Sequence, residues 1–113
     1  MNKFIKIIFF NILIFPLLFL NLVTASEKLK IGLLVPMTGT NKDLGHSIIK
    51  AVRLAVKDID DNIIEVFPKD TASSPDKTLQ SALELKDIGV KVVIGPVFHK
   101  SLIYLDEVID LTF

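Results

Sequence analysis

Hydrophobic and polar positions change their spacing several times along residues 29–113, and each change predicts a new element. The segments Leu29–Val35 ("LKIGLLV") and 90–95 ("VKVVIG") are nearly continuous apolar runs, and a proline follows each of them. Strands that are buried on both faces of a parallel sheet have this pattern. A third run, "IIEVF" at 63–67, stops before Pro68. We predict a strand over each of the three segments.

Between these strands the apolar positions recur with helical spacing. The first predicted helix begins at 44 and has about four turns, ending in "DIDDN"; its apolar face comprises Leu44, Ile48, Val52, Ala55 and Ile59. The second has clear start and stop signals, with Ser74 as N-cap, Pro75 at the first helical position and Gly89 just after the end. We also predict a third helix over 101–108 and the start of a fourth strand in 109–113.

The resulting order of strands and helices determines the fold class. Successive strands begin about 30 residues apart, the length of a strand–helix–strand unit. Such alternation with short loops favours a parallel sheet with helices packed on its faces. We therefore predict an α/β three-layer sandwich with a parallel, Rossmann-like sheet. No shift in composition marks a domain boundary within residues 26–113.

The first 25 residues have the pattern of a cleaved signal peptide. Lys3 and Lys6 precede the apolar run "IIFFNILIFPLLFLNLV", and small residues follow it. Val23 and Ala25 then occupy positions −3 and −1 of a cleavage site before Ser26. A buried helix and an uncleaved membrane anchor are the alternatives. Cleavage is favoured because a spanning helix usually needs about 20 predominantly apolar residues, and Pro16, Asn11 and Asn21 interrupt this run.

Charge and cysteine content exclude several classes of function. The whole chain has 13 basic and 13 acidic residues, and removal of Lys3 and Lys6 makes the remainder slightly negative. This balance gives no reason to expect nucleic acid or an anionic membrane surface as a partner. The chain has no cysteine. A lipid-modified cysteine, a disulfide framework and thiolate metal sites are therefore excluded.

The loop "PMTGTNKDLG", residues 36–45, is the first candidate for chemistry. Gly39 and Gly45 have the spacing of neither the dinucleotide-binding nor the P-loop motif, and no lysine follows Gly45. The loop does precede a predicted helix, whose free N–H groups could hold an anion or a carboxylate. Thr38, Thr40 and Asn41 add polar groups to it. A polar-ligand site is possible here, although capping and turning explain these residues equally well.

No catalytic or metal-binding pattern emerges elsewhere. His46 and His99 lack an acidic partner at ligand spacing, and the serines lack the G-x-S-x-G setting of a nucleophile. The aspartates of "DIDD" have no central glycine for a calcium loop. Asp70 follows the second strand, at the sheet edge where open α/β folds bind ligands, and capping the next turn is its alternative role. We expect no catalytic residue, no metal and no cofactor.

Three motifs together resemble a known family. They are the P-x-T-G turn at Pro36–Gly39, Asp70 followed by Pro75 in "DTASSP", and "VVIGP" at 92–96. With these motifs the chain resembles the type I periplasmic binding proteins, and above all the leucine/isoleucine/valine-binding proteins. The resemblance covers residues 26–113 but only the first part of the family's domain. We therefore expect that the chain is a truncated piece of a longer protein, with part of its first lobe.

The resemblance implies a non-enzymatic protein of the periplasm. In this family two α/β lobes, joined by hinge strands, enclose the ligand, and the partner is the permease of an ABC transporter. The amino-acid binders hold their ligand with the loops after strands one and three, which here are residues 38–44 and 97–101. Helix N-termini in those loops would donate N–H groups to the ligand's carboxylate. The candidate ligand-binding residues are Thr38, Gly39, Thr40, Asn41, Leu44, Asp70, Val97, Phe98, His99 and Ser101.

Two departures from the amino-acid binders favour a second interpretation. The loop after strand three reads "VFHKS", with His99 and Lys100 where those binders tend to have a serine-rich turn, and the connection "DIDDN" is short. Both features resemble the penicillin-binding protein activators, whose partner is a peptidoglycan synthase. That branch is commonly lipid-anchored, and this chain has no cysteine for it. A small standalone structural domain is the third and least favoured interpretation.

Overall fold

The computed structural model describes residues 2–8, 26–60, 62–108 and 111–112. Residues 2–8 are helical. The elements that follow are β1 (Leu29–Val35), α2 (Lys42–Ile59), β2 (Ile64–Asp70), α3 (Pro75–Ile88), β3 (Val92–Ile94) and the 3₁₀ helix η1 (His99–Glu107). This order confirms the predicted alternation of strands and helices.

The three strands form one parallel sheet in the order β2-β1-β3, so β1 lies in the middle. Leu29 is in register with Ile64, and Val35 with Asp70, along the whole length of β1 and β2. On the other side, Ile31–Leu33 pairs with Val92–Ile94. The carboxyl ends of the strands therefore meet at one edge of the sheet. The predicted α/β fold with a parallel sheet is confirmed.

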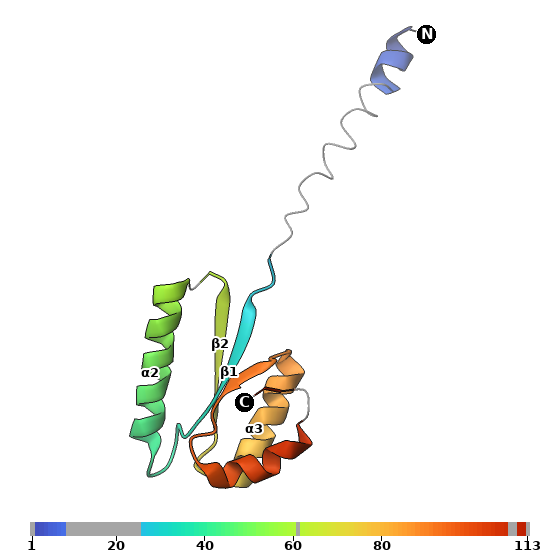
Figure 1. The fold of residues 1–113 in the computed structure, drawn as a ribbon. Coiled ribbons are helices and arrows are strands. Elements are labelled where there is room, and N and C mark those ends of the chain that lie inside the picture. The colour runs from blue at the N-terminus through green and yellow to red at the C-terminus, as the bar shows by residue number, and fades with distance from the viewer. Residues whose placement is uncertain (1, 9–25, 61, 109–110, 113) are drawn as a thin grey trace.

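The helices α2 and α3 lie on opposite sides of this sheet (Figure 1). Successive side chains of a strand point to opposite faces, so the central strand β1 contributes to both. Leu33 and Val35 pack with Ile49 of α2 in one apolar cluster. Leu34 packs with Ala82 and Leu85 of α3, and with residues of β3 and η1, in the other. A strand in this position needs apolar residues on both faces, which explains the nearly continuous run.

The second helix has the predicted ends. Ser74 is the N-cap of α3, Pro75 is its first residue, and Gly89 ends it in the left-handed conformation with a φ of 89°. The hydroxyl of Ser74 makes no capping hydrogen bond; instead its carbonyl accepts the N–H and the hydroxyl of Thr78. The side chain of Lys30 donates to the carbonyl of Ile88 at 3.0 Å, which satisfies the other end of the helix.

Two predicted boundaries are wrong. The second strand does not stop before Pro68 but continues through it to Asp70. A proline is tolerated there because β2 is paired in the described sheet only with β1, so the missing N–H can point away from the ladder. The first helix begins at Lys42, two residues before the apolar pattern. Polar residues can form a first helical turn because that turn projects beyond the core.

The third predicted helix differs in type. Residues 99–107 form a 3₁₀ helix, η1, rather than an α-helix over 101–108. Ser101 and Leu105 are its buried side chains, a spacing of four, while the three residues between them are exposed. The predicted fourth strand lies largely outside the described residues. Within it, Thr112 forms a parallel bridge to Val92 beside β3.

Candidate ligand-binding site

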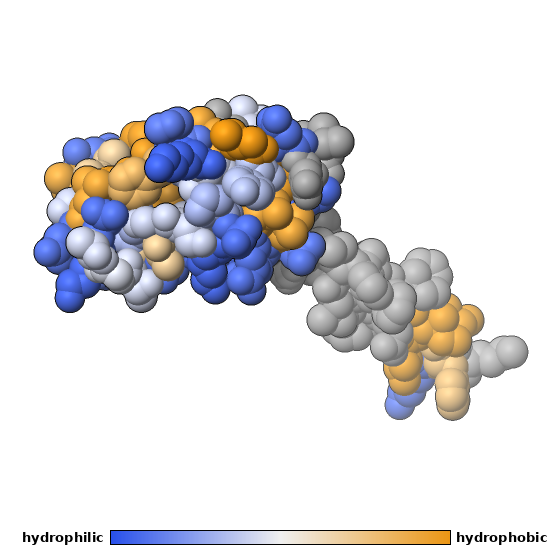
Figure 2. Space-filling view, turned by 90° about the horizontal axis from the view of Figure 1, so that it is seen from below, coloured by the Kyte–Doolittle hydropathy of each residue, from blue (hydrophilic) through white to orange (hydrophobic). Residues whose placement is uncertain are grey.

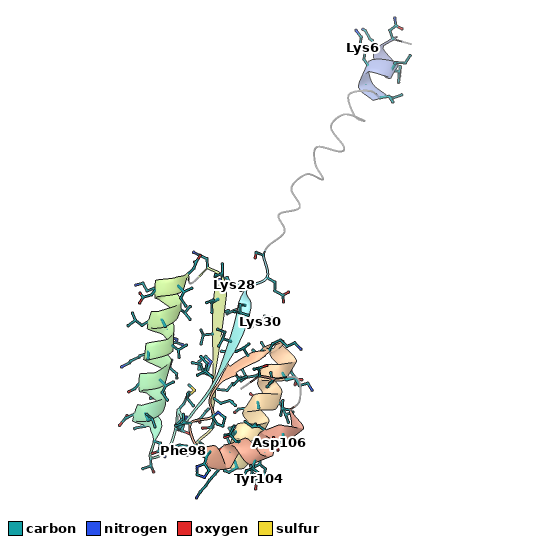
Figure 3. The ribbon with its side chains drawn as sticks, in the orientation of Figure 1. Lys6, Lys28, Lys30, Phe98, Tyr104 and Asp106 are labelled. Carbon is teal, nitrogen blue, oxygen red and sulfur yellow. The ribbon has the colours of Figure 1, made fainter. Side chains whose placement is uncertain are left out.

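The loops that follow the three strands meet at the carboxyl edge of the sheet. They are residues 36–41 after β1, 71–74 after β2 and 95–98 after β3. Each leads directly into a helix, so three helix starts converge on one end of the molecule. Phe98 lies at this end, whereas Lys28 and Lys30 lie at the other end of the sheet (Figure 3). Open α/β sheets bind ligands at the carboxyl edge.

Asp70, the last residue of β2, connects the first two of these loops. One carboxylate oxygen, Oδ1, accepts the N–H of Met37 at 2.7 Å, of Thr38 at 3.3 Å and of Ala72 at 2.8 Å. The other, Oδ2, accepts the hydroxyl of Thr38 at 2.6 Å. The carboxylate therefore has partners both in the loop after β1 and in the loop after its own strand.

These hydrogen bonds lower the pKa of Asp70 further below physiological pH. Partial burial raises the pKa of the carboxyl, but hydrogen bonds from the Thr38 side chain and from the N–H groups of Met37, Ala72 and Thr38 lower it more. The net effect moves the pKa from 3.8 to about 2. Hydrogen bonds donated to a carboxylate stabilise its ionised form. Asp70 is consequently an anion at every physiological pH.

A second link joins the same two loops. The side-chain amide of Asn41 donates to the hydroxyl of Ser73 at 3.1 Å. Asn41 is the N-cap residue of α2, yet its side chain makes no capping bond to that helix. Ser73 and Ala72 both have left-handed backbone conformations, with φ angles of 57° and 46°. Such angles cost non-glycine residues free energy and are found most often at functional sites.

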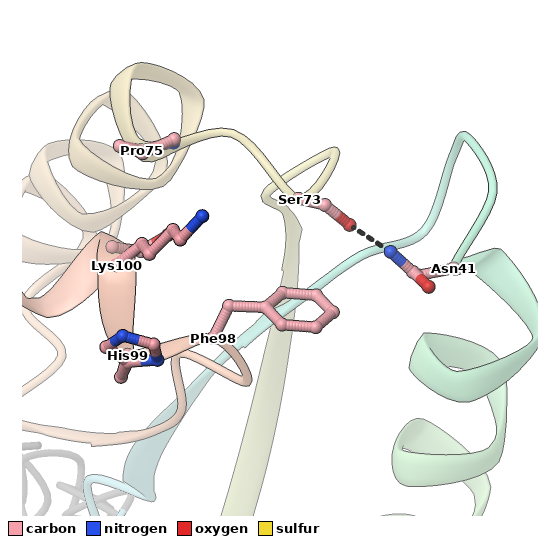
Figure 4. Close-up of a pocket in the computed structure, with 7 residues that line it drawn as sticks. Asn41, Ser73, Pro75, Phe98, His99 and Lys100 are labelled. Carbon is pink, nitrogen blue, oxygen red and sulfur yellow. Dashed lines mark hydrogen bonds between the residues drawn. The ribbon is translucent and has the colours of Figure 1, made fainter.

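A pocket of about 280 Å³ opens beside this link. Its lining comes from all three loops and comprises Asn41, Ser73, Pro75, Phe98, His99, Lys100 and Ser101. The ring of Phe98 and the chain of Lys100 reach from the start of η1 towards Ser73 and Pro75 (Figure 4). Figure 2 views the molecule from the carboxyl end of the sheet, where polar and weakly polar residues occupy the centre of the face and hydrophobic residues lie along its margins.

The structure brings some of the predicted site residues to this pocket and leaves others elsewhere. Asn41, Phe98, His99 and Ser101 line it. Thr38, Gly39 and Thr40 are exposed in the loop after β1. Leu44 is an exposed residue in the first turn of α2, and Val97 packs against the apolar cluster under α2. Asp70 is not one of the lining residues and accepts hydrogen bonds from the loops after β1 and β2.

Three lining residues were not among the predicted ligand contacts. Ser73 comes from the loop after β2 and Pro75 is the first residue of α3, a segment that the sequence indicated only as the start of a helix. The signal that could have found them is the parallel order of the strands, because all loops at the carboxyl edge are neighbours. Lys100 lies within the predicted loop 97–101 but was noted only as a departure from the amino-acid binders.

The described part of the chain contains no group of three or more histidine or acidic side chains that could hold a metal ion. Its helices are also too short or too polar to span a bilayer. The predicted signal peptide falls mostly in residues 9–25, outside the described residues, and Ser26 is the first residue described after it.

Comparison with known proteins gives the family. Residues 28–108 match the family model described as periplasmic binding protein. No curated protein sequence matches significantly. One similar solved structure is an ABC-transporter solute-binding protein from Rhodopseudomonas palustris in complex with 3,4-dihydroxybenzoic acid, with a TM-score of 0.66 and 34% sequence identity. A second is the leucine-binding protein LivK from Thermotoga maritima, with a TM-score of 0.63 and 21% identity. A third is LpoA from Haemophilus influenzae, with a TM-score of 0.57 and 25% identity.

These matches cover most of this chain but a small part of the others. The chain aligns over 72% of its own length with the dihydroxybenzoate complex, over 71% with LivK and over 74% with LpoA. It spans only 24% of the first two and 14% of the third. The resemblance inferred from the three sequence motifs is confirmed, and the family is one of binding proteins rather than enzymes. The chain belongs to the periplasmic binding protein family.

Proposed function

We propose that the chain is part of an extracytoplasmic solute-binding protein of an ABC transporter, and that its site takes a small carboxylate with an apolar body. The observation that carries this proposal is the pocket at the carboxyl edge of the sheet, where the loops after all three strands contribute to the lining. Small-molecule sites combine an apolar surface with a few polar groups that fix the ligand's orientation, and this pocket has both.

The chemistry of the lining supports an anionic ligand. Lys100 is positively charged, and none of the seven lining residues is acidic. Phe98 and Pro75 offer apolar surface, while Asn41 and Ser73 offer an amide and a hydroxyl. A ligand with its carboxylate near Lys100 and Ser101 and its hydrophobic body on Phe98 would use both the positive charge and the apolar surface of this lining. Both a leucine-like and a benzoate-like molecule satisfy this description.

The similar structures support the same class of ligand. The R. palustris protein was solved with 3,4-dihydroxybenzoic acid, an aromatic carboxylate, and LivK is described as a leucine-binding protein. We further propose that residues 1–25 are a cleaved signal peptide and that 26–113 form the first part of the binding domain, which would place the protein in the periplasm. The permease of the transporter is the proposed partner.

Ligand titration of the full-length protein that contains this chain tests the proposal, because the chain spans only 24% of the length of similar binding proteins. Chemical shifts or calorimetric heats should respond to benzoate, 3,4-dihydroxybenzoate or leucine, and not to benzamide, which lacks the carboxylate. Lys100→Gln should weaken the binding roughly tenfold, because a hydrogen bond to a charged group contributes about 1.5 kcal/mol or more. Lys50→Gln, an exposed lysine on α2, is the matched control. No response to any carboxylate at millimolar concentration would reject this function.

A regulator of peptidoglycan synthesis is the second candidate. The similarity to LpoA favours it, together with the sequence "VFHKS" in the loop after β3. This candidate predicts that the chain captures a peptidoglycan synthase and shows no saturable binding of small carboxylates. Retention of the synthase by the immobilised chain, combined with a negative titration, would favour the regulator over the transporter component.

A further inference from the structure

We propose that Asp70 is a positioning residue of this site. It accepts the N–H donors of the loop after β1 and fixes the pocket wall formed by Asn41 and Ser73. The ligand's carboxylate is then bound by residues at the start of η1 and not by the loop after β1. This inference rests on the proposed function. It concerns which wall of the pocket receives the charged end of the ligand.

The first step concerns the hydrogen-bond partners of the N–H groups in the loop after β1. Free N–H groups at this point would be an obvious place for a ligand's carboxylate. Here the N–H groups of Met37 and Thr38 already donate to Oδ1 of Asp70, and the hydroxyl of Thr38 donates to Oδ2. A carboxylate from the protein itself holds this position. A second carboxylate close to it would be repelled, because Asp70 is ionised.

The second step is the conformation of the loop after β2. Ala72 and Ser73 both have positive φ angles, which side-chain-bearing residues adopt only when their surroundings hold them there. Asp70 supplies one such restraint by accepting the N–H of Ala72, and the hydroxyl of Thr71 accepts the N–H of Ser73 at 3.4 Å. This strained turn places the Ser73 hydroxyl where the amide of Asn41 reaches it.

The third step follows from where these side chains lie. Asn41 and Ser73 line the pocket, but Asp70 does not. Asp70 thus acts on the site through its neighbours, and the wall that it fixes is polar and uncharged. Lys100, the positively charged side chain in the lining, lies on the opposite wall, with Phe98 and Ser101 at the start of η1. The charged end of the ligand is therefore directed towards residues 98–101.

The experiment has one arm without ligand. Amide hydrogen exchange of the full chain is compared between wild type, Asp70→Ala and the control Asp43→Ala, which removes an exposed carboxylate from the first turn of α2. Asp70→Ala should speed the exchange of Met37, Thr38 and Ala72 at least tenfold, a size typical of a lost charged hydrogen bond, and Asp43→Ala should not. Unchanged exchange of these three amides would overturn the inference. If Asp70→Ala does not fold, Asp70→Asn, which keeps a neutral oxygen as acceptor but removes the charge, should still speed the exchange of these three amides, by a smaller factor than alanine, and Asp43→Asn should not.

The second arm uses benzoate as the probe. Asp70→Ala should weaken binding roughly tenfold, because the wall of the pocket is no longer preorganised. The shifts caused by benzoate should be largest at residues 98–101 in both proteins. Wild-type affinity in Asp70→Ala, or largest shifts at residues 37–40, would overturn the inference. If wild-type protein binds no carboxylate, the proposed function fails, whereas the exchange arm still decides whether Asp70 holds the two loops.

Discussion

Two glycines bracket the start of α2, and a side chain would be harmful at each for a different reason. Gly39 has a φ of 80°, and a Cβ there would have nothing within 4 Å. Gly45 lies inside the helix with ordinary backbone angles, but its position is buried, and a Cβ would collide with the carbonyl oxygen of Pro36. Gly39 therefore permits the turn, whereas Gly45 permits close contact between α2 and the end of β1.

This difference predicts unequal costs of alanine at the two positions. Gly39→Ala should lower the free energy of unfolding by about 1 kcal/mol, the usual cost of a left-handed alanine. Gly45→Ala should cost about 3 kcal/mol or more, because the obstacle is backbone and cannot rotate away. Urea unfolding of both variants measures this. Equal costs, or a larger cost at Gly39, would contradict the assigned roles.

The low pKa of Asp70 predicts how stability depends on pH. Its carboxyl has a pKa of about 2 in the folded chain, against 3.8 for the unperturbed group. The contribution of this carboxylate to the free energy of unfolding is therefore fully present above about pH 4, and it is lost as the pH falls through about 2. Asp70→Asn should lower the free energy of unfolding by about 1–2 kcal/mol at pH 7, after allowance for solvent screening. Urea unfolding should show this difference disappearing near pH 2, and a constant difference would refute the mechanism.

At the scale of single residues, the sequence placed the candidate residues in loops that meet at the carboxyl edge of the sheet, but it did not give the contacts of each residue. Asp70 could be placed at the carboxyl edge because it lies three residues after the end of the strand-like run 63–67. Its four hydrogen-bond contacts depend on the register of β1 against β2 and on the path of two loops, and neither is encoded in local spacing. The inclusion of Ser73 in the pocket depends in turn on a strained turn, which local propensity does not predict.

Among the elements, β1 and α3 pack closely against each other at Gly32. A Cβ added to Gly32, in the middle of β1, would lie 2.6 Å from Cδ1 of Leu85. Leu85 is a fully buried side chain of α3 and belongs to the apolar cluster with Leu34 and Val93. The absence of a side chain at Gly32 thus makes the space that Leu85 fills.

Complementary packing of this kind predicts coupling between two substitutions. Leu85→Ala should cost about 3 kcal/mol because it leaves a cavity, and Gly32→Ala about 1–3 kcal/mol because it overfills one. In the double variant the new methyl group at position 32 occupies the space that the Leu85 side chain leaves. The loss of stability should therefore be smaller than the sum of the two single losses by about 1 kcal/mol or more. Urea unfolding of the four proteins measures the coupling. Strict additivity would show that the two residues do not share this space.

Elements were predicted best where a strong local signal coincided with burial. The central strand β1 and the ends of α3 were identified correctly. An apolar run that ends at Pro36 and a helix bounded by Pro75 and Gly89 leave few alternatives. The continuation of β2 through Pro68 was missed, since only the sheet order shows that this strand is paired on one side. The 3₁₀ geometry of η1 was missed as well, because a spacing of four between buried residues does not separate the two helix types.

At the scale of the whole molecule, one face of the sheet is incompletely covered. Val92 and Ile94 of β3 are in register with Ile31 and Leu33, so they point to the face on which α2 packs. They are nevertheless 41% and 43% exposed, and no described helix lies over β3 on that face. Similar structures contain the matched part as only 24% of their length. Val92 and Ile94 therefore form an exposed apolar patch on this face.

This open face predicts that residues 26–113, without the apolar segment that precedes them, bind a hydrophobic dye. Val92→Thr with Ile94→Thr should reduce the dye fluorescence by about half or more, because exposed apolar strand residues make such patches. The change in stability should be small, because threonine retains the preference of a β-branched residue for strands. Leu54→Thr, which replaces a 62% exposed side chain on α2, is the control and should leave the dye signal nearly unchanged. An equal loss in the control would mean that β3 is not the principal exposed surface.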